Sequence, residues 1–174
     1  MRLLPHHPAV LLALLLSGCG YHTASSATHL LPGTRTVAVP TFATRVLNFH
    51  TETAFTDAVI RELNTRTRFR VENQRTTTTD ALLSGTILTE TAAPLTYDSL
   101  SGQTSSYLLT ITAKVVLTDT HTNRVLYQND SLTYREQYQS TTDLNTFIQE
   151  DSAAVNRVAR SFAAAVVSEV LESF

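Results

Sequence analysis

The only cysteine of the 174-residue chain, Cys19, offers the clearest chemistry. It ends the tetrad Leu16-Ser17-Gly18-Cys19. An apolar residue, two small residues and a cysteine form the pattern that bacterial lipoprotein signal peptidase recognises. A diacylglycerol group would be attached to the Cys19 thiol, and cleavage before this residue would make it the new N-terminus. We therefore predict lipidation at Cys19 and a signal peptide over residues 1–18.

The composition of the leader favours this interpretation. Arg2 supplies a positive charge, and Ala9–Leu16 is an unbroken apolar run. This run suits a signal-peptide core, because a membrane-spanning helix needs about 20 apolar residues. One alternative is a buried N-terminal helix, which Pro5 and Pro8 disfavour. The other is a catalytic cysteine, which the position of Cys19 behind a leader disfavours.

Three arginines form a second candidate group. Arg66, Arg68 and Arg70 alternate along a predicted strand, so their side chains would share one face of a sheet. Guanidinium groups bind phosphate through paired hydrogen bonds, which makes this group a candidate anion-binding stripe. The alternative is a solvated sheet face, or an edge strand that charge protects from aggregation.

The sequence shows no signal of catalysis. It has no Gly-x-Ser-x-Gly motif and no glycine-rich phosphate loop. The four histidines after Cys19 are isolated from one another, so no metal site is indicated. We therefore expect no enzyme activity, no cofactor and no metal. The formal net charge of −2, which becomes −3 without Arg2, argues against nucleic-acid binding.

The elements that would position these groups follow a polar tether. Residues 19–34 are rich in Ser, Thr and His and show no periodicity, whereas residues 35–174 form one predicted domain. Arg35–Pro40 is a predicted strand. Thr51–Asn64 is a predicted helix, because large apolar residues recur at every fourth position from Phe55 onward.

The strand that carries the arginines, Arg66–Val71, comes next. The strand, helix, strand order predicts a parallel crossover. Asp80–Thr91 is a further predicted strand, in which Gly85 would let another backbone or a bulky ring come close. Ala93–Gln103 contains a proline and a glycine and is predicted to be a loop.

The C-terminal half has the clearest periodicity. Ser105–Thr118 alternates apolar and polar residues, which predicts a strand with one buried and one wet face. A turn at Thr120–Asn123 leads to a last strand, Arg124–Tyr138, and Leu144–Glu172 is a long predicted helix whose apolar stripe includes Phe162. The elements predict an α+β fold. The expected architecture is a two-layer α/β sandwich, β-α-β-β-β-α, with a mixed four- to five-stranded sheet and two helices on one face.

The order of these motifs resembles the LPS-assembly lipoprotein family, LptE. The resemblance covers nearly all of the chain after the leader. One departure is Thr44, where many members carry Asn. The matching stretches are Cys19-Gly20-Tyr21-His22, Thr36-Val37-Ala38-Val39-Pro40-Thr41-Phe42, the helix Glu52–Leu63, the strand Asp80–Ile87, Tyr138 and the alanine-rich C-terminal helix.

This resemblance implies an outer-membrane protein that faces the periplasm and is held in the membrane by the lipid on Cys19. Such a protein plugs the lumen of the LptD β-barrel translocon, helps that barrel to assemble, and binds lipopolysaccharide on its way to the cell surface. Gly20 directly after Cys19 is consistent with outer-membrane sorting. In this setting Arg66, Arg68 and Arg70 are candidates for contacting lipopolysaccharide phosphates.

A second resemblance leads to a different class of protein. Lipoproteins of the curli-secretion and cell-wall-synthase-activator families also carry a Val-Ala-Val strand, here Val37-Ala38-Val39, followed by a helix. They generally lack the Cys-Gly-Tyr start and the ending of strand, hairpin and long helix. A chain of that type would be a regulator or a pore subunit.

Overall fold

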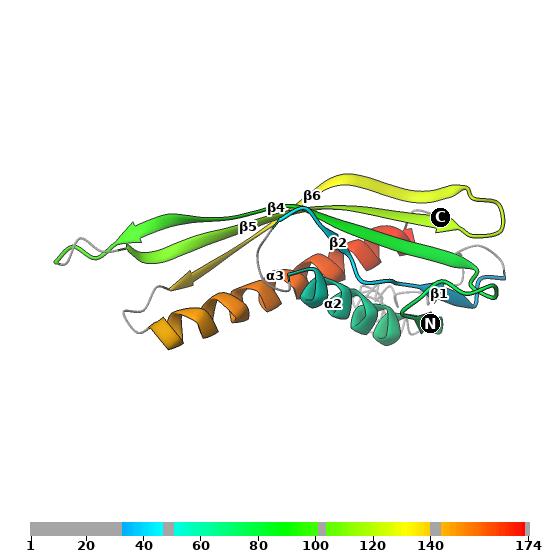
Figure 1. Cartoon of the computed structure of the whole chain (residues 1–174), viewed down its shortest axis with the longest axis horizontal. Coiled ribbons are helices and arrows are strands. Elements are labelled where there is room, and N and C mark those ends of the chain that lie inside the picture. Colours follow the sequence, from blue (N-terminus) through cyan, green and yellow to red (C-terminus); the bar gives the residue numbers. More distant parts are fainter. Residues whose placement is uncertain (1–32, 47–50, 101–103, 140–143, 173–174) are drawn as a thin grey trace, which may run out of the picture.

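The computed structural model describes residues 33–46, 51–100, 104–139 and 144–172. Within them, two helices cover one face of a mixed sheet (Figure 1), which confirms the predicted α+β sandwich. The sheet has six strands, where four to five were predicted. In chain order the elements are β1 (Thr36–Ala38), β2 (Ala43–Thr44), α2 (Thr51–Arg66), β3 (Arg70–Glu72), β4 (Ala81–Tyr97), β5 (Thr104–Asp119), β6 (Val125–Gln139) and α3 (Leu144–Glu172).

The strands run in the order β3-β1-β4-β5-β6, and β2 pairs separately with β4. β1 is parallel to both of its neighbours, with Val37 opposite Val71 on one side and Ala81 on the other. Parallel neighbours need a crossover connection, which α2 supplies between β1 and β3. The predicted parallel crossover is thus confirmed. β4, β5 and β6 follow as antiparallel hairpins.

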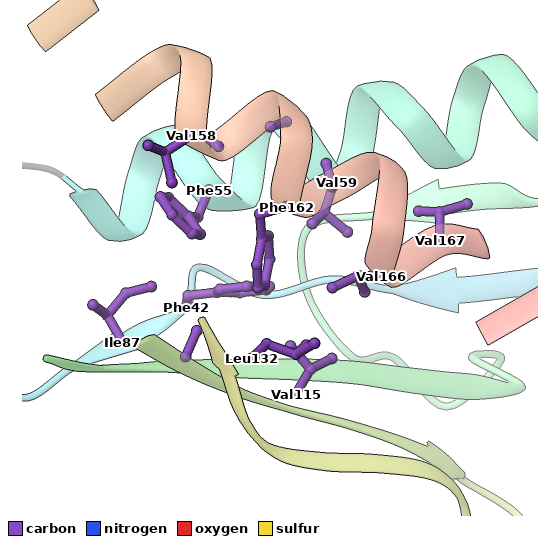
Figure 2. Close-up of a cluster of buried hydrophobic side chains, with 14 of the residues drawn as sticks. Phe42, Phe55, Val59, Ile87, Val115, Leu132, Val158, Phe162, Val166 and Val167 are labelled. Atoms are coloured by element: carbon purple, nitrogen blue, oxygen red, sulfur yellow. The ribbon is translucent and has the colours of Figure 1, made fainter. Parts of the chain in front are cut away.

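The two helices meet the sheet through one shared core. Phe162 of α3 is fully buried, and its ring centroid lies 4.7 Å from that of Phe55 on α2 and 5.7 Å from that of Tyr134 on β6. Figure 2 shows Phe162 between α2 and the sheet, close to Phe42, whose ring centroid is 6.2 Å away. Both helices occupy this layer because their apolar stripes, which the sequence predicted, face the same side of the sheet.

β5 supplies the middle of the sheet. Its alternate residues from Leu109 to Leu117 are buried beneath the helices, and those between them lie on the opposite face. This confirms the predicted strand with two unlike faces. The turn predicted at Thr120–Asn123 is also present, and Asn123 has a φ of 56°, a conformation that asparagine tolerates better than most residues.

β4 is longer than predicted, since it continues to Tyr97 and includes the first part of the expected loop Ala93–Gln103. Pro94, which suggested the loop, lies in the ladder opposite Tyr107. Proline is tolerated in an edge strand because it lacks only the amide donor. β4 pairs with β5 along one side. Among the described residues, its other side has no strand partner beyond Ile87, so the second half of β4 is an edge of the sheet.

Gly85 lies in β4 where the ring of Phe42 crosses the strand. A Cβ at this position would overlap the ring, with Cζ of Phe42 only 2.5 Å away. The backbone N–H of Phe42 donates to Thr56 Oγ1 of α2 at 2.9 Å, which helps to fix the ring over the strand. The prediction that a ring comes close to Gly85 is confirmed.

Candidate functional site

The structure corrects the predicted arginine stripe at Arg66. This residue is the last of α2, and the helix end is fixed by Thr67, whose N–H and hydroxyl both donate to Leu63 O at 2.9 and 2.6 Å. The Arg66 guanidinium donates to Ser168 Oγ of α3 at 2.7 Å and lies 3.6 Å from Glu62. Arg66 therefore joins the two helices and does not lie on a strand face.

The other two predicted arginines remain at the surface. Arg68 is exposed in the connection between α2 and β3, and Arg70 is exposed at the start of β3, an edge strand of the sheet. Arg70 Nε lies 3.4 Å from Glu72 Oε1. The strand predicted over Arg66–Val71 is wrong in its first part, because the helix continues to Arg66 and only the last residues enter the sheet.

The predicted lipidation site, Cys19, together with the predicted signal peptide and most of the tether, lies outside the described residues. Thr44, the departure from the family pattern, is the second residue of β2 and pairs with Ile87. Its hydroxyl accepts the N–H of Val46 at 3.2 Å, so the residue closes a local turn at the end of the strand.

The most distinctive surface was not predicted. β4 and β5 continue together beyond the helices as a long hairpin (Figure 1), and we call residues 93–100 with 104–108 the β4–β5 arm. Three large apolar side chains are exposed near its tip: Leu95 is 46% exposed, Tyr97 64% and Leu100 97%. Exposed apolar groups gathered at one end of a molecule are typical of an interaction surface.

The β4–β5 arm is also almost free of charge. Between Glu90 and Lys114 the sequence contains a single charged residue, Asp98. Hydroxyl groups supply the polarity instead, and Thr96 Oγ1 lies 2.7 and 2.6 Å from the hydroxyls of Ser105 and Ser106 across the hairpin. This charge-poor stretch could have identified the arm from the sequence. The prediction instead divided the stretch into a strand and a loop.

The face of the sheet away from the helices is mixed in character. Thr112 and Thr133 face one another with their hydroxyls 3.1 Å apart, and Lys114 Nζ lies 2.7 Å from Asp130 Oδ1. Cross-strand pairs of this kind stabilise a sheet face, and no described helix lies over this one (Figure 1). The face thus offers hydroxyls and one ion pair to a partner.

Helix α3 is fixed to the edge strand β6 by two polar contacts. Arg157 Nε donates to Glu136 Oε1 at 2.6 Å, and the Tyr127 hydroxyl donates to Glu169 Oε2 at 2.5 Å. Burial, together with the neighbouring Glu169 carboxylate, raises the pKa of Tyr127 well above its ordinary value, so this hydroxyl stays protonated as a donor. These contacts position the helix, and nothing in them resembles catalytic chemistry.

The part of the chain that the structure describes contains neither a candidate metal site nor a candidate membrane-spanning helix. There, no three His, Cys, Asp or Glu side chains gather as metal ligands would. Neither described helix combines the length and the apolar character of a membrane span. The candidate interaction surfaces of the described region are the β4–β5 arm, the sheet face away from the helices, and the exposed arginines.

The fold is similar to those of solved bacterial proteins. A Xanthomonas campestris protein of the DUF330 family is 15% identical, with a TM-score of 0.54 over 82% of this chain and 89% of its own. Uncharacterized lipoprotein B of Nitrosomonas europaea is 13% identical, with a TM-score of 0.52 over 79% and 82%. At such identities the similarity shows the fold alone. No protein with a curated description matches the sequence.

A family model gives the more specific result. The model of LptE, described as lipopolysaccharide-assembly, matches residues 34–170. That span includes every strand of the sheet, the whole of α2 and nearly all of α3. The matched region therefore corresponds to the entire two-layer fold, which agrees with the resemblance seen in the sequence. The chain belongs to the LptE family of lipopolysaccharide-assembly proteins.

Proposed function

We propose that this chain is an outer-membrane lipoprotein that plugs an LptD-like β-barrel, helps it to assemble, and assists lipopolysaccharide transport to the cell surface. The observation that carries the proposal is the family match over residues 34–170, which spans the complete sheet, the whole of α2 and nearly all of α3. The role is that of a binding and assembly protein and involves no catalysis.

The β4–β5 arm supports a role inside a larger protein. Charges that are removed from water without a partner are very costly, whereas apolar groups and hydroxyls that keep a hydrogen bond are enclosed at much lower cost. The arm carries only Asp98 between Glu90 and Lys114 and exposes Leu95, Tyr97 and Leu100. A narrow hairpin with a single charged residue suits insertion into the lumen of a barrel.

The proposed anchor is the lipid on Cys19. A fully extended tether from Cys19 to Gly33 would reach roughly 45 Å at about 3.3 Å per residue. The domain could therefore enter the periplasmic opening of a barrel while its N-terminus stays in the surrounding membrane. Lipopolysaccharide phosphates would be met by exposed arginines, for which Arg68 and Arg70 remain candidates.

Affinity purification of the full chain from solubilised membranes tests the proposal. We expect a large β-barrel protein to co-purify. Recovery of a cell-wall synthase or a curli-type secretion pore, with no barrel of the LptD type, would support the alternative class of lipoprotein and contradict the proposal.

A photo-crosslinking residue placed at Tyr97 in the arm tests the orientation. Val125 is the matched control, because it is also exposed and apolar, at 50%, but begins β6 at the other end of the sheet. We expect Tyr97 to crosslink to the barrel with higher yield than Val125. Equal yields at the two positions would show that the arm is not the inserted element.

A further inference from the structure

A polar pocket lies at the end of the sheet opposite the β4–β5 arm. It forms where the connection between β3 and β4 meets the turn between β5 and β6, and its volume is about 420 Å³. The run of four threonines in that connection has no role in the proposed function. The pocket is lined by one arginine, one histidine and four threonines: Arg75, Thr76, Thr77, Thr79, Thr120 and His121.

Hydrogen bonds between the two loops fix the walls of this pocket. The backbone N–H and the hydroxyl of Thr120 both donate to Asp80 O, at 3.0 and 2.9 Å, and the same hydroxyl also contacts Thr79 O. Within the threonine run, Thr76 N–H donates to Thr79 Oγ1 at 2.9 Å and closes a turn. Because these walls are already ordered, little conformational entropy would be lost when a ligand binds.

Among the described residues, Arg75 is the only permanent cation that lines the pocket. Its Nη2 makes one long contact, 3.4 Å to Thr120 O. A guanidinium has five N–H donors. Among the described side chains, no carboxylate lies within 4.0 Å of the Arg75 guanidinium. Most of its hydrogen-bonding capacity therefore remains available to a ligand.

The carboxylates that contact the lining residues have other partners. Glu72 lies 3.4 Å from Arg70 and also accepts the Thr76 hydroxyl at 3.3 Å. Asp80 accepts the two backbone N–H groups at the start of β1, at 2.8 and 2.9 Å, and lies 3.2 Å from the His121 ring. Their negative charge is thus partly compensated, and Arg75 faces the pocket without a carboxylate of its own.

We propose that this pocket binds a phosphate group. The planar guanidinium of Arg75 matches two phosphate oxygens, which is the arrangement that makes arginine a common phosphate ligand. The Thr77 hydroxyl and the His121 ring flank it with further polar groups. The phosphate belongs either to a lipid headgroup or to a small soluble molecule, and the two share this recognition chemistry.

Titration of the full chain in neutral detergent micelles with inorganic phosphate tests the proposal, with the NMR signals of the His121 ring as a reporter inside the pocket. We expect saturable shifts in the wild-type chain and about tenfold weaker binding in Arg75→Gln, since a charge-assisted pair is lost. Arg124→Gln removes the same charge from the neighbouring turn without touching the lining and should change affinity less than about twofold.

Dioctanoyl phosphatidic acid, a lipid whose headgroup is a phosphate monoester, distinguishes the two sources. If the lipid binds more tightly than inorganic phosphate, and this binding depends on Arg75, the site is assigned to a lipid headgroup. If the lipid binds as tightly as inorganic phosphate or more weakly, the site is assigned to a soluble phosphate. Absence of Arg75-dependent binding for both probes overturns the proposal. Equal loss in Arg75→Gln and Arg124→Gln also overturns it, because it would reflect general surface charge. Unchanged thermal unfolding of both variants shows that the fold is intact.

Discussion

The ring of Phe42 occupies the space that a side chain at Gly85 would need. Phe42 belongs to the segment between β1 and β2, and Gly85 lies in β4, so this contact seats the N-terminal part of the chain on the sheet. The ring also lies 6.2 Å from Phe162, centroid to centroid. It cannot move away from the strand without disturbing the centre of the core.

Gly85→Ala is therefore expected to destabilise the chain by about 1–3 kcal/mol, the usual cost of overpacking a core. Urea unfolding of the full chain measures the effect. In a Phe42→Leu background the smaller side chain leaves room for the new methyl group, so Gly85→Ala should cost clearly less there. An equal cost in both backgrounds would mean that the two residues do not compete for space.

Phe162→Ala is expected to lower the free energy of unfolding by about 3–5 kcal/mol, because it removes a fully buried ring from the core. For a chain of this size the melting temperature should fall by roughly 10 °C. Ser161→Ala, at the neighbouring exposed position of α3, is the control. If the melting temperature stayed at the wild-type value and only complex formation with the barrel failed, Phe162 would be an interface residue.

Asp80 is expected to make stability depend on acid pH. Hydrogen bonds from the backbone N–H groups of Arg35 and Thr36, with a smaller contribution from His121, hold the pKa of this carboxyl below its ordinary value. A depressed folded-state pKa gives stability above about pH 4, and this stability is lost as the pH falls through the folded pKa. Asp80→Asn should thus melt below wild type at pH 7, and the difference should shrink in acid. Asp57→Asn, which removes an exposed carboxylate from α2, is the control variant.

The exposed arginines are expected to contribute to lipopolysaccharide binding in a salt-dependent way, since exposed charges are screened beyond about 8 Å at physiological ionic strength. Replacing Arg66, Arg68 and Arg70 together with Gln should weaken binding, but Arg66 also joins α2 to α3. The Arg68→Gln, Arg70→Gln double variant therefore isolates the effect on binding. Arg61→Gln, Arg160→Gln removes two exposed charges from the helices as a control. Equal lipopolysaccharide binding by both double variants would show that Arg68 and Arg70 belong only to a solvated surface of the sheet.

Cys19 is expected to carry lipid in the mature protein. Two or more acyl chains anchor a protein stably, whereas one holds it only weakly. Cys19→Ala should leave the chain uncleaved or release it from the membrane, whereas Ser26→Ala in the tether should be processed normally. Intact-mass measurement of membrane-derived protein checks the prediction, and an unmodified Cys19 in that material would refute it.

The sequence predicted the elements whose periodicity is long. Helix α3 has the predicted bounds, Leu144–Glu172, and β5 differs from its prediction by one residue at each end. Both are amphipathic over many residues, so their pattern outweighs local exceptions. β2 has only two residues and gives no periodic signal, so its pairing with β4 depends on tertiary structure.

The errors arose where a local signal opposed the tertiary context. Pro94 suggested a loop, yet the unpaired edge of β4 accommodates it. Alternation over Arg66–Val71 suggested a strand, yet Arg66 still belongs to a helix that the core stabilises. The phosphate pocket could not be predicted either, because Arg75 and His121 lie far apart in sequence and only the paired strands bring their loops together.

The parallel pairing of β1 sets the order in which a newly made chain can complete its sheet. Thr36 pairs with Arg70, and Val37 pairs with Ala81, so the first strand has no partner until α2 and β3 have followed it. During synthesis from the N-terminus, the apolar residues Val37, Ala38 and Val39 therefore remain without their strand neighbours while that stretch emerges. We therefore expect a chain with this topology to need a holding chaperone more than an antiparallel meander does, since each strand of a meander can pair with the one just before it.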